Sequence, residues 1–467
     1  MSGSTRGEAD GIQRRTLLRA GVQMIGGVAM ATPFQALLTR GAHAAERDPA
    51  AGYGDLLPIP DGTTKLPLIR LPKGFTYKTI GWTGDDMTDG VKTPNSHDGM
   101  AVVAADGDRI TLIRNHEVSG DNGAFINSDI TYDKYAGGGT TNMIFNTKTG
   151  ELEKSWSSIS GTVRNCAGGL TPWGSWLTCE ETLASIGDKT GEGDKERTMR
   201  FEQDHGWICE VPADGTAQPV PLKDMGRFSH EAVAVDPATG IVYETEDSGS
   251  AGFFRFIPNE KGKLQAGGKL QMLKIAGVPD LTGGVEKDKT FKVEWVDIPK
   301  PHEGHSPSVF HQGQEQGGTR FARLEGCWYG NERIYFDSTS GGDVKEGQIW
   351  EYTPRSEELR LVFESPSKQV LSQPDNICFS PRGKGLVCCE DSGGPNRLIG
   401  ITLDGRVFNF AENNCVVDGR RNRIKGDFRG SEWAGACFSP DGKWLFANIQ
   451  RPGITVAITG PWENGAL

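Results

Sequence analysis

Six residues with metal-binding side chains occupy matching places in a unit that repeats along the chain. Five open a short apolar run, and the sixth stands two residues earlier in its copy. In order they are Asp98, Cys166, Glu231, Glu325, Asp375 and Glu432. Five carboxylates and a thiol that converge in one space cannot all ionise without counter-charge, so we expect cations among them. Carboxylates suit hard ions such as Ca²⁺, Mg²⁺ or Fe³⁺, and because a thiolate favours a transition metal, iron fits the mixed set.

Further polar residues flank this set. Acids also end the second apolar run of most copies. Acids in such places more often lie on the solvated edge of a blade than bind a metal. We single out Glu117, Glu180 and Glu181 as candidate metal ligands because they adjoin the first two copies' ring positions. Arg323 stands two residues before Glu325, on the same face of an extended segment, and its guanidinium could clamp a phosphate or pair with an acid.

A second arginine, Arg227, stands four residues before Glu231. A phosphate ligand and an ion-pair partner of a ring acid are equally good interpretations of it. The scarcity of histidine, with 8 in 467 residues, argues against a histidine-based zinc centre.

The repeated unit predicts the elements that must position these residues. Each copy is an apolar run, a turn with Gly and a second apolar run, which is typical of a β-hairpin. A second, more polar hairpin follows most copies, so that two hairpins make a four-stranded blade. Six blades of roughly 70 residues predict an all-β, six-bladed β-propeller, whose inner strands line a central channel. A pair of β-sandwiches is the alternative.

The same pattern predicts how the ring closes and where its long loops lie. The strand-like segment Phe75–Ile80 could complete the last blade. Long polar, Gly-rich loops over residues 182–202, 276–316 and 416–430 are expected to form a lid or pocket wall. No linker divides residues 45–467, which we interpret as one propeller domain.

Residues 1–44 are typical of a twin-arginine signal peptide. Arg14-Arg15 precedes a mildly apolar stretch and Ala42-His43-Ala44, a cleavage site. An unstructured N-terminus is the alternative. The prediction is that the twin-arginine machinery exports the folded chain to the periplasm or the cell exterior. No later segment reaches about 18 consecutive apolar residues, so we expect no stable membrane association.

Net charge and cysteine content limit the kinds of partner and metal site that the chain can have. The net charge is −11, and residues 1–44 carry three net positive charges, so the remainder is strongly acidic. This argues against nucleic acid as a partner. The nine cysteines are odd in number and none has zinc-type spacing, so we expect most to be buried. We expect a monomer that acts on a small molecule.

The chain resembles the PhoX family of secreted alkaline phosphatases. The resemblance covers about residues 95–455 in patches, and its most specific part is the block from residue 165 to residue 181. The motifs are Asn165-Cys166-Ala167-Gly168-Gly169, Thr171-Pro172-Trp173-Gly174, Thr178-Cys179-Glu180-Glu181, Gly226-Arg227-Phe228-Ser229-His230-Glu231 and Ala447-Asn448-Ile449-Gln450. The family is a six-bladed propeller whose central iron and calcium ions are bridged by an oxo group. It hydrolyses phosphate monoesters and some diesters.

The resemblance implies roles for particular residues. It implies that Cys166, Glu231, Glu325 and Asp375 bind the iron–calcium core, that Arg323 contacts phosphate, and that Glu180 or Glu181 binds calcium. We choose Cys166 over Cys179 because the repeat places Cys166 in the ring and Cys179 on a second strand. The family's Arg-Pro-Glu reads Arg323-Leu324-Glu325 here, and the chain is shorter than typical members.

The resulting hypothesis is metal-dependent hydrolysis of phosphate esters. A cluster of Fe³⁺ and Ca²⁺ would bind the phosphate and activate a metal-bound oxygen nucleophile. Arg323 and Glu231 are the expected catalytic residues, and Asp98, Glu117, Glu432 and the residues named above the expected metal ligands. Two alternatives stay open, a calcium-dependent lactonase-type hydrolase and a non-catalytic periplasmic binding module with structural calcium.

Overall fold

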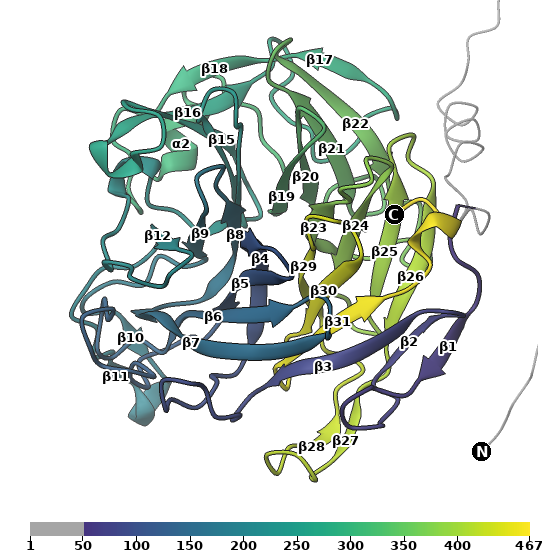
Figure 1. Ribbon diagram of the computed structural model, residues 1–467. Coiled ribbons are helices and arrows are strands. Elements are labelled where there is room, and N and C mark those ends of the chain that lie inside the picture. Colours follow the sequence, from purple (N-terminus) through teal and green to yellow (C-terminus); the bar gives the residue numbers. More distant parts are fainter. Residues whose placement is uncertain (1–50) are drawn as a thin grey trace, which may run out of the picture. The chain divides into compact units, whose positions relative to one another are not determined.

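Strands make up nearly all of the regular structure in the computed structural model, which describes residues 51–467. The expected signal peptide over residues 1–44 lies outside the described residues. Six antiparallel sheets surround a central channel like the blades of a propeller (Figure 1). The predicted six-bladed, all-β architecture is therefore confirmed, and the described residues form one compact unit.

Each blade begins with the strand that lines the channel, and these six inner strands contact one another in a closed circle. The first three blades follow one another along the chain. Blade 1 contains β4 (His97–Asp106), β5 (Arg109–His116), β6 (Gly138–Asn146) and β7 (Glu151–Thr162). Blade 2 contains β8 (Asn165–Leu170), β9 (Ser175–Glu180) and β12 (Ile208–Pro212). Blade 3 contains β13 (His230–Val235), β14 (Val242–Glu246), β15 (Phe253–Pro258), β16 (Gly268–Lys274) and β18 (Glu294–Asp297).

The last three blades complete the ring. Blade 4 contains β19 (Leu324–Gly330), β20 (Arg333–Ser338), β21 (Gln348–Thr353), β22 (Glu358–Glu364) and β17 (Thr290–Lys292). Blade 5 contains β23 (Pro374–Phe379), β24 (Gly385–Glu390), β25 (Arg397–Thr402), β26 (Val407–Asn413), β2 (Ile69–Pro72) and β1 (Leu56–Ile59). Blade 6 contains β29 (Trp433–Phe438), β30 (Trp444–Ile449), β31 (Ile454–Thr459) and β3 (Thr76–Trp82).

Ring closure follows the prediction, and the number of strands in a blade follows it in part. β3 pairs antiparallel with β31, so a segment from the start of the domain completes the last blade. The predicted four-stranded blade is found in blades 1 and 6, whereas blade 2 has three strands, blades 3 and 4 have five, and blade 5 has six. The extra strands come from the N-terminal segment and from the long loop over residues 276–316, which cover sheet edges.

The long loops also carry short elements of their own. Residues 182–202 include the two-stranded ribbon of β10 (Lys189–Thr190) and β11 (Arg197–Thr198). Residues 416–430 include the ribbon of β27 (Val416–Asp418) and β28 (Lys425–Asp427). The remaining elements are the helix α2 (Val309–Gln314) and the 3₁₀ turns η1 (Gly193–Lys195), η2 (Lys223–Met225), η3 (Leu264–Ala266) and η4 (Trp462–Asn464).

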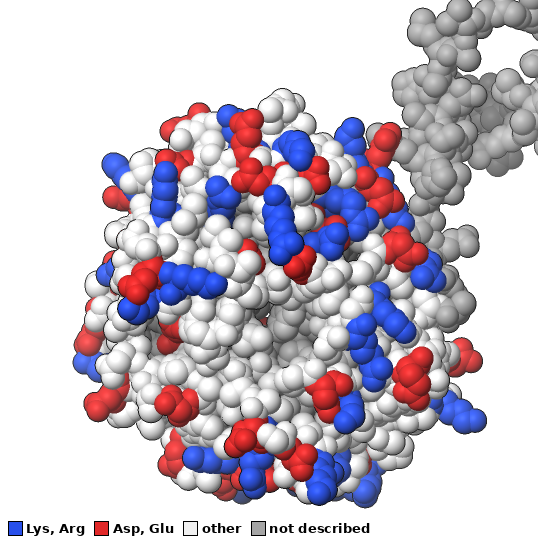
Figure 2. Space-filling view, turned by 45° about the horizontal axis from the view of Figure 1, so that its top comes forward, with Lys and Arg blue, Asp and Glu red and all other residues white. Residues whose placement is uncertain are grey.

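Cysteine burial agrees with the sequence-based expectation, and the surface carries charges of both signs. Figure 2 shows basic and acidic side chains intermixed over one face, around a hollow near the centre of the ring. All nine cysteines are buried and free of disulfides. Across residues 51–467, no helix combines the length and hydropathy needed to span a bilayer.

Small residues bring the inner strands close together below the ring positions. A Cβ on Gly326 would lie 2.4 Å from the backbone oxygen of Asp375 in the next blade. The channel space that remains there is about 20 Å³, and Trp328 lines it from β19. Trp328 also packs against four separate hydrophobic clusters, so one side chain joins the cores of several blades.

A Trp328→Ala variant should therefore lose about 3 kcal/mol of unfolding free energy, because it leaves a cavity where several blades meet. Thermal or urea unfolding measures this loss. Trp156→Ala, on the outer strand β7, is the control and should cost clearly less. Equal stability of the two variants would show that Trp328 does not join the blades.

Candidate metal centre

A β-bulge at the start of every inner strand positions the ring residues. At each bulge two residues of the inner strand face one residue of the second strand. Because a bulge re-aims side chains locally, it turns the first of its two residues toward the channel mouth. In five blades that first residue is a predicted ring residue: Asp98, Cys166, Glu231, Glu325 or Asp375. In blade 6 it is Gly435, and Glu432 lies directly before the strand.

The residue before the inner strand forms a second level of the site. In four blades this residue has a left-handed backbone, with φ between 48° and 51°: Ser96, Arg164, Arg323 and Gln373. Non-glycine residues held in this conformation are strained, and such strain clusters at functional sites. Glu432 takes the corresponding place in blade 6, because its backbone oxygen accepts from the residue after the second strand, as those of Ser96, Arg164 and Gln373 do. It stands three residues before Gly435.

Residues from both levels line a cavity of about 370 Å³ at the channel mouth. Eight carboxyl groups and three guanidinium groups face it, together with a thiol and an amide. The lining residues are Glu117, Arg164, Cys166, Glu181, Glu231, Asp247, Arg323, Glu325, Asp375, Asp391, Gly430, Ser431, Glu432, Gln450 and Arg451. Asp98 lies just beneath them, fully buried, and its Oδ2 accepts a hydrogen bond from Gln450 at 3.1 Å.

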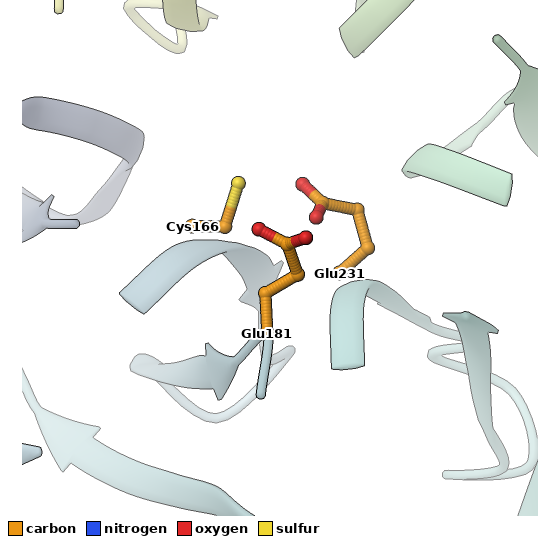
Figure 3. A group of neighbouring side chains, drawn as sticks. All are labelled: Cys166, Glu181 and Glu231. Atoms are coloured by element: carbon orange, nitrogen blue, oxygen red, sulfur yellow. The ribbon is translucent and has the colours of Figure 1, made fainter. Parts of the chain in front are cut away.

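Three groups of side chains within this set could each hold a cation. In each group one ligand atom per residue lies within 4.8 Å of the others. The groups are Cys166 with Glu181 and Glu231, Asp98 with Glu117 and Glu432, and Glu231 with Glu325 and Asp375. Figure 3 shows Cys166, Glu181 and Glu231 pointing toward one another. Glu231 belongs to two of the groups and so joins them.

The structure brings together every predicted site residue except Glu180. One carboxylate oxygen of Glu180 accepts from the backbone of Val163 at 2.8 Å and approaches His205 Nδ1 at 2.7 Å. The other accepts from the backbone of Gly206 and Trp207. Because these contacts occupy both oxygens, we correct the candidate set and leave Glu180 out. Its neighbour Glu181 follows the end of β9 and faces the cavity.

Arg227 also lies outside the cavity, so neither interpretation of it fits. Its guanidinium donates to the backbone oxygens of His205 and Ala184 and to Ser185 Oγ. It therefore anchors the loop after β9. Cys179, the alternative thiolate, is fully buried on β9 opposite the bulge at Cys166 and does not line the cavity.

Two arginines hold the acids of the cavity in place. The guanidinium of Arg323 donates to both oxygens of Asp247, at 2.9 and 3.2 Å, and to Glu325 at 2.5 Å. Arg164 donates to Glu117 at 3.2 Å and to Glu181 at 2.7 Å. Burial opposes the charge on each guanidinium, but the facing carboxylates outweigh it and raise the pKa of both.

Arg164 was not predicted as a site residue, although its spacing from Cys166 indicates it. Arg164 stands two residues before Cys166, which is the spacing between Arg323 and Glu325. Asp247, Asp391 and Gln450 were not selected either. Each directly follows the second strand of its blade, as Glu117 and Glu181 do, so aligning the copies on that strand would have found them. Arg451 follows Gln450 and lies on an irregular loop, where the repeat carries no signal.

The donor set fits metal ions. Burial raises the pKa of Asp98, Glu231, Glu325 and Glu432 well above the usual range, and neighbouring carboxylates raise it further. One buried oxygen of Asp98 and one of Glu231 have no hydrogen-bond partner among residues 51–467. Buried carboxylates that lack donors need either protons or cations. Bound cations would satisfy these oxygens and cancel the excess negative charge.

Removing metal should therefore make the fold sensitive to alkaline pH. Burial raises the pKa of Glu181 to about 9 and, together with Asp391, that of Asp375 to about 8. Between about pH 4 and pH 9 the folded metal-free protein thus binds more protons than the unfolded chain, and its unfolding free energy falls as pH rises. We expect the midpoint of thermal unfolding of chelator-treated protein to fall from about pH 5 to pH 9.

Protein reloaded with metal is the control for this experiment. Its midpoint should change much less over the same range, because cations take the place of protons. A metal-free midpoint that stays level or rises with pH would contradict the electrostatics described above.

Comparisons with known proteins agree with the propeller fold. The model of a family described as alkaline phosphatase PhoX matches residues 51–154 and 145–453. Among solved structures, Pseudomonas fluorescens PhoX in complex with vanadate, a transition state analogue, has a TM-score of 0.62 at 17% identity. The match covers 90% of this chain and 99% of that one.

A gluconolactonase from Xanthomonas campestris is also similar, with a TM-score of 0.39 at 13% identity over 90% of this chain and 97% of that one. This similarity is too low to support the lactonase alternative. No curated protein sequence matches the chain.

Proposed function

The chain belongs to the alkaline phosphatase PhoX family and is a metal-dependent hydrolase of phosphate esters, and we propose that the cavity at the channel mouth is its active site. The observation that carries this proposal is the position of Glu231. It is buried, it joins two groups of metal-binding side chains, and one of its oxygens has no partner within residues 51–467. We propose Fe³⁺ and Ca²⁺ as the ions and a small phosphoester as the substrate.

The side chains favour different ions at different parts of the cavity. Cys166 contributes the only sulfur among the lining residues, so its group with Glu181 and Glu231 suits iron. The group of Asp98, Glu117 and Glu432 offers only oxygen, which suits Ca²⁺. Glu325 and Asp375 share Glu231 with the first group. When bound, such ions act as Lewis acids toward phosphoryl oxygens.

The protein's own residues orient the substrate. Asp247 and Glu325 fix the guanidinium of Arg323 at the cavity wall through Nε and Nη2, so that Nη1, which makes none of these contacts, can donate to a non-bridging phosphate oxygen. Glu231 and the other buried carboxylates stay in place because the bulges and the closed channel below leave them little freedom. Arg451 has no hydrogen bond or ion pair from its guanidinium to residues 51–467, so it is free to meet the anionic substrate at the mouth.

An Arg323→Met variant should lose about 10²-fold to 10³-fold in kcat/KM on p-nitrophenyl phosphate, as expected when one donor to the transition state is removed. Steady-state kinetics measures this loss. Arg320→Met is the matched control, because Arg320 pairs with exposed Asp280 outside the cavity. If both variants keep full activity, Arg323 does not contact the phosphate.

Elemental analysis of the mature protein, together with its visible spectrum, tests the proposed centre. Iron and calcium in one sample, with a charge-transfer band, would support it, and turnover of p-nitrophenyl phosphate would follow. Calcium alone in a colourless protein would overturn the assignment of iron to Cys166.

We also propose export in the folded state through the twin-arginine pathway, to the periplasm or beyond. Arg14-Arg15 and Ala42-His43-Ala44 support this. Replacing both arginines by lysine should leave the precursor in the cytoplasm, which fractionation would detect. Unchanged export of the lysine variant would contradict the proposed route.

A further inference from the structure

A second polar cavity lies between the first and last blades, outside the cavity of acids. It measures about 390 Å³ and is lined by β3, β6 and β7, with Arg114 of β5 among its residues. We call it the interblade cleft. It lies where β3 completes blade 6, so the cleft borders the closure of the ring.

Arg114 is the unusual residue of the interblade cleft. Its side chain is buried, with 1% exposure, and its Nε has no hydrogen-bond partner among the described residues. Its terminal nitrogens donate only to hydroxyl groups, to Thr455 Oγ1 at 2.7 Å and to Thr141 Oγ1 at 3.2 Å. Hydroxyl groups carry no charge, so these bonds leave the guanidinium without a counter-ion.

No carboxylate in the described part of the chain forms an ion pair with Arg114. Asp85 acts on it from a distance, but its oxygens are held by Arg421 at 2.6 Å and Asn422 at 2.7 Å. Asp86 and Glu151 also line the cleft, but they pair with Lys92 and Lys78. The buried imidazoles of His97 and His116 cannot supply negative charge. Burial lowers the pKa of Arg114 to about 9, which reflects the cost of burying a cation without a partner.

The lining leaves room for an anion beside this cation. The cleft of about 390 Å³ adjoins Arg114, and Gly81 lets β3 pass close to the guanidinium, because a Cβ there would lie 2.9 Å from Nη1. Lys78 and Arg421 also line the cleft. Lys78 pairs with Glu151, whose side chain is 65% exposed, and such an exposed pair is weak enough to rearrange around a ligand.

We propose that the interblade cleft binds a small oxyanion, phosphate or sulfate, through Arg114. A guanidinium recognises oxyanions through parallel N–H donors, and Nε is the nitrogen of Arg114 that has no hydrogen-bond partner among the described residues. Because Nε is buried, a ligand reaches it only when neighbouring side chains move. The bound oxyanion would neutralise the buried charge and link β3 to blade 1, so that it stabilises the closed ring. This inference does not depend on the reaction at the acid-lined cavity.

Thermal unfolding of the full chain tests this proposal, with the Arg323→Met variant as background to weaken binding of phosphate at the active site. Phosphate and sulfate at about 100 times their dissociation constants should each raise the midpoint by about 3 °C. Adding Arg114→Met to this background should abolish the rise. No rise in the background variant, or an equal rise after Arg114→Met, would overturn the proposal.

A crystallographic measurement on the wild-type chain keeps the proposal testable if Arg114→Met does not fold. Crystals soaked in selenate, an analogue of sulfate, should show an anomalous peak within hydrogen-bond distance of Arg114 Nε. Water at that position, or peaks confined to the acid-lined cavity, would overturn it.

Discussion

A Glu231→Gln variant should lose its bound metal and about 10³-fold or more of its kcat/KM on phosphate monoesters. Glu231 is buried and takes part in both the sulfur-containing group and the group with Glu325 and Asp375. The amide of Gln has nearly the same shape but carries no charge and offers one oxygen instead of two. The substitution therefore removes ligands from two sites while the fold is preserved. Metal analysis and steady-state kinetics on the same preparation measure the effect.

Glu244→Gln is the matched control for this experiment. Glu244 is also a buried glutamate of blade 3, on β14, but it does not line the cavity. Burial raises its pKa well above the usual range, so the neutral amide should replace it with little change. We expect this variant to keep its metal and its activity. Full activity in a folded Glu231→Gln protein would refute the proposed centre.

A Cys166→Ser variant should lose the charge-transfer band, most of its iron and about 10²-fold in activity. Burial and nearby carboxylates raise the pKa of Cys166 well above the usual range, so in the metal-free protein its thiol stays protonated. A bound transition metal would stabilise the thiolate, whereas a serine hydroxyl is a far poorer ligand for such an ion. Visible spectra and iron content before and after reconstitution measure the change.

The chain supplies a control for this substitution in the neighbouring strand. Cys179 is buried on β9, directly opposite the bulge that contains Cys166, but outside the cavity. Cys179→Ser should keep the band and the iron content, at some cost in stability. The reverse result, with the band lost only in Cys179→Ser, would exchange the roles of the two cysteines.

Much of the fold follows from local pattern. Short apolar runs joined by Gly turns specify hairpins, and six copies of the same unit can bury their faces only against one another in a ring. The recurrence of Asp98, Glu231 and Asp375 at one place in that unit therefore predicted that these acids converge. The segment that completes blade 6 was also predictable, because Phe75–Ile80 has a strand pattern without a partner near it in sequence.

The strands at the outer edges of the blades depend on which segments lie side by side in the folded protein, and a local sequence pattern does not describe this. Strands β17 and β18 come from one loop but join different blades, because each covers whichever sheet edge lies beside it. β1 and β2 extend blade 5 for the same reason. These segments pair with the sheet edges that are still unpaired once the ring has formed. Blades 3, 4 and 5 therefore have more than the predicted four strands.

The candidate metal centre was also predictable in part from the sequence, and the rest of it was set by the tertiary structure. Residue type and repeat position identified the ring of acids and Cys166, because these properties belong to the chain itself. Glu180 and Glu181 are adjacent and chemically identical, and the strand's alternation and the loop donors around Glu180 separate their roles. Arg164 and Arg227 differ in the same way, since one faces the cavity and the other faces a loop. Which side of a strand a residue faces is set by bulges and by neighbouring blades, and these exist only after the ring has closed.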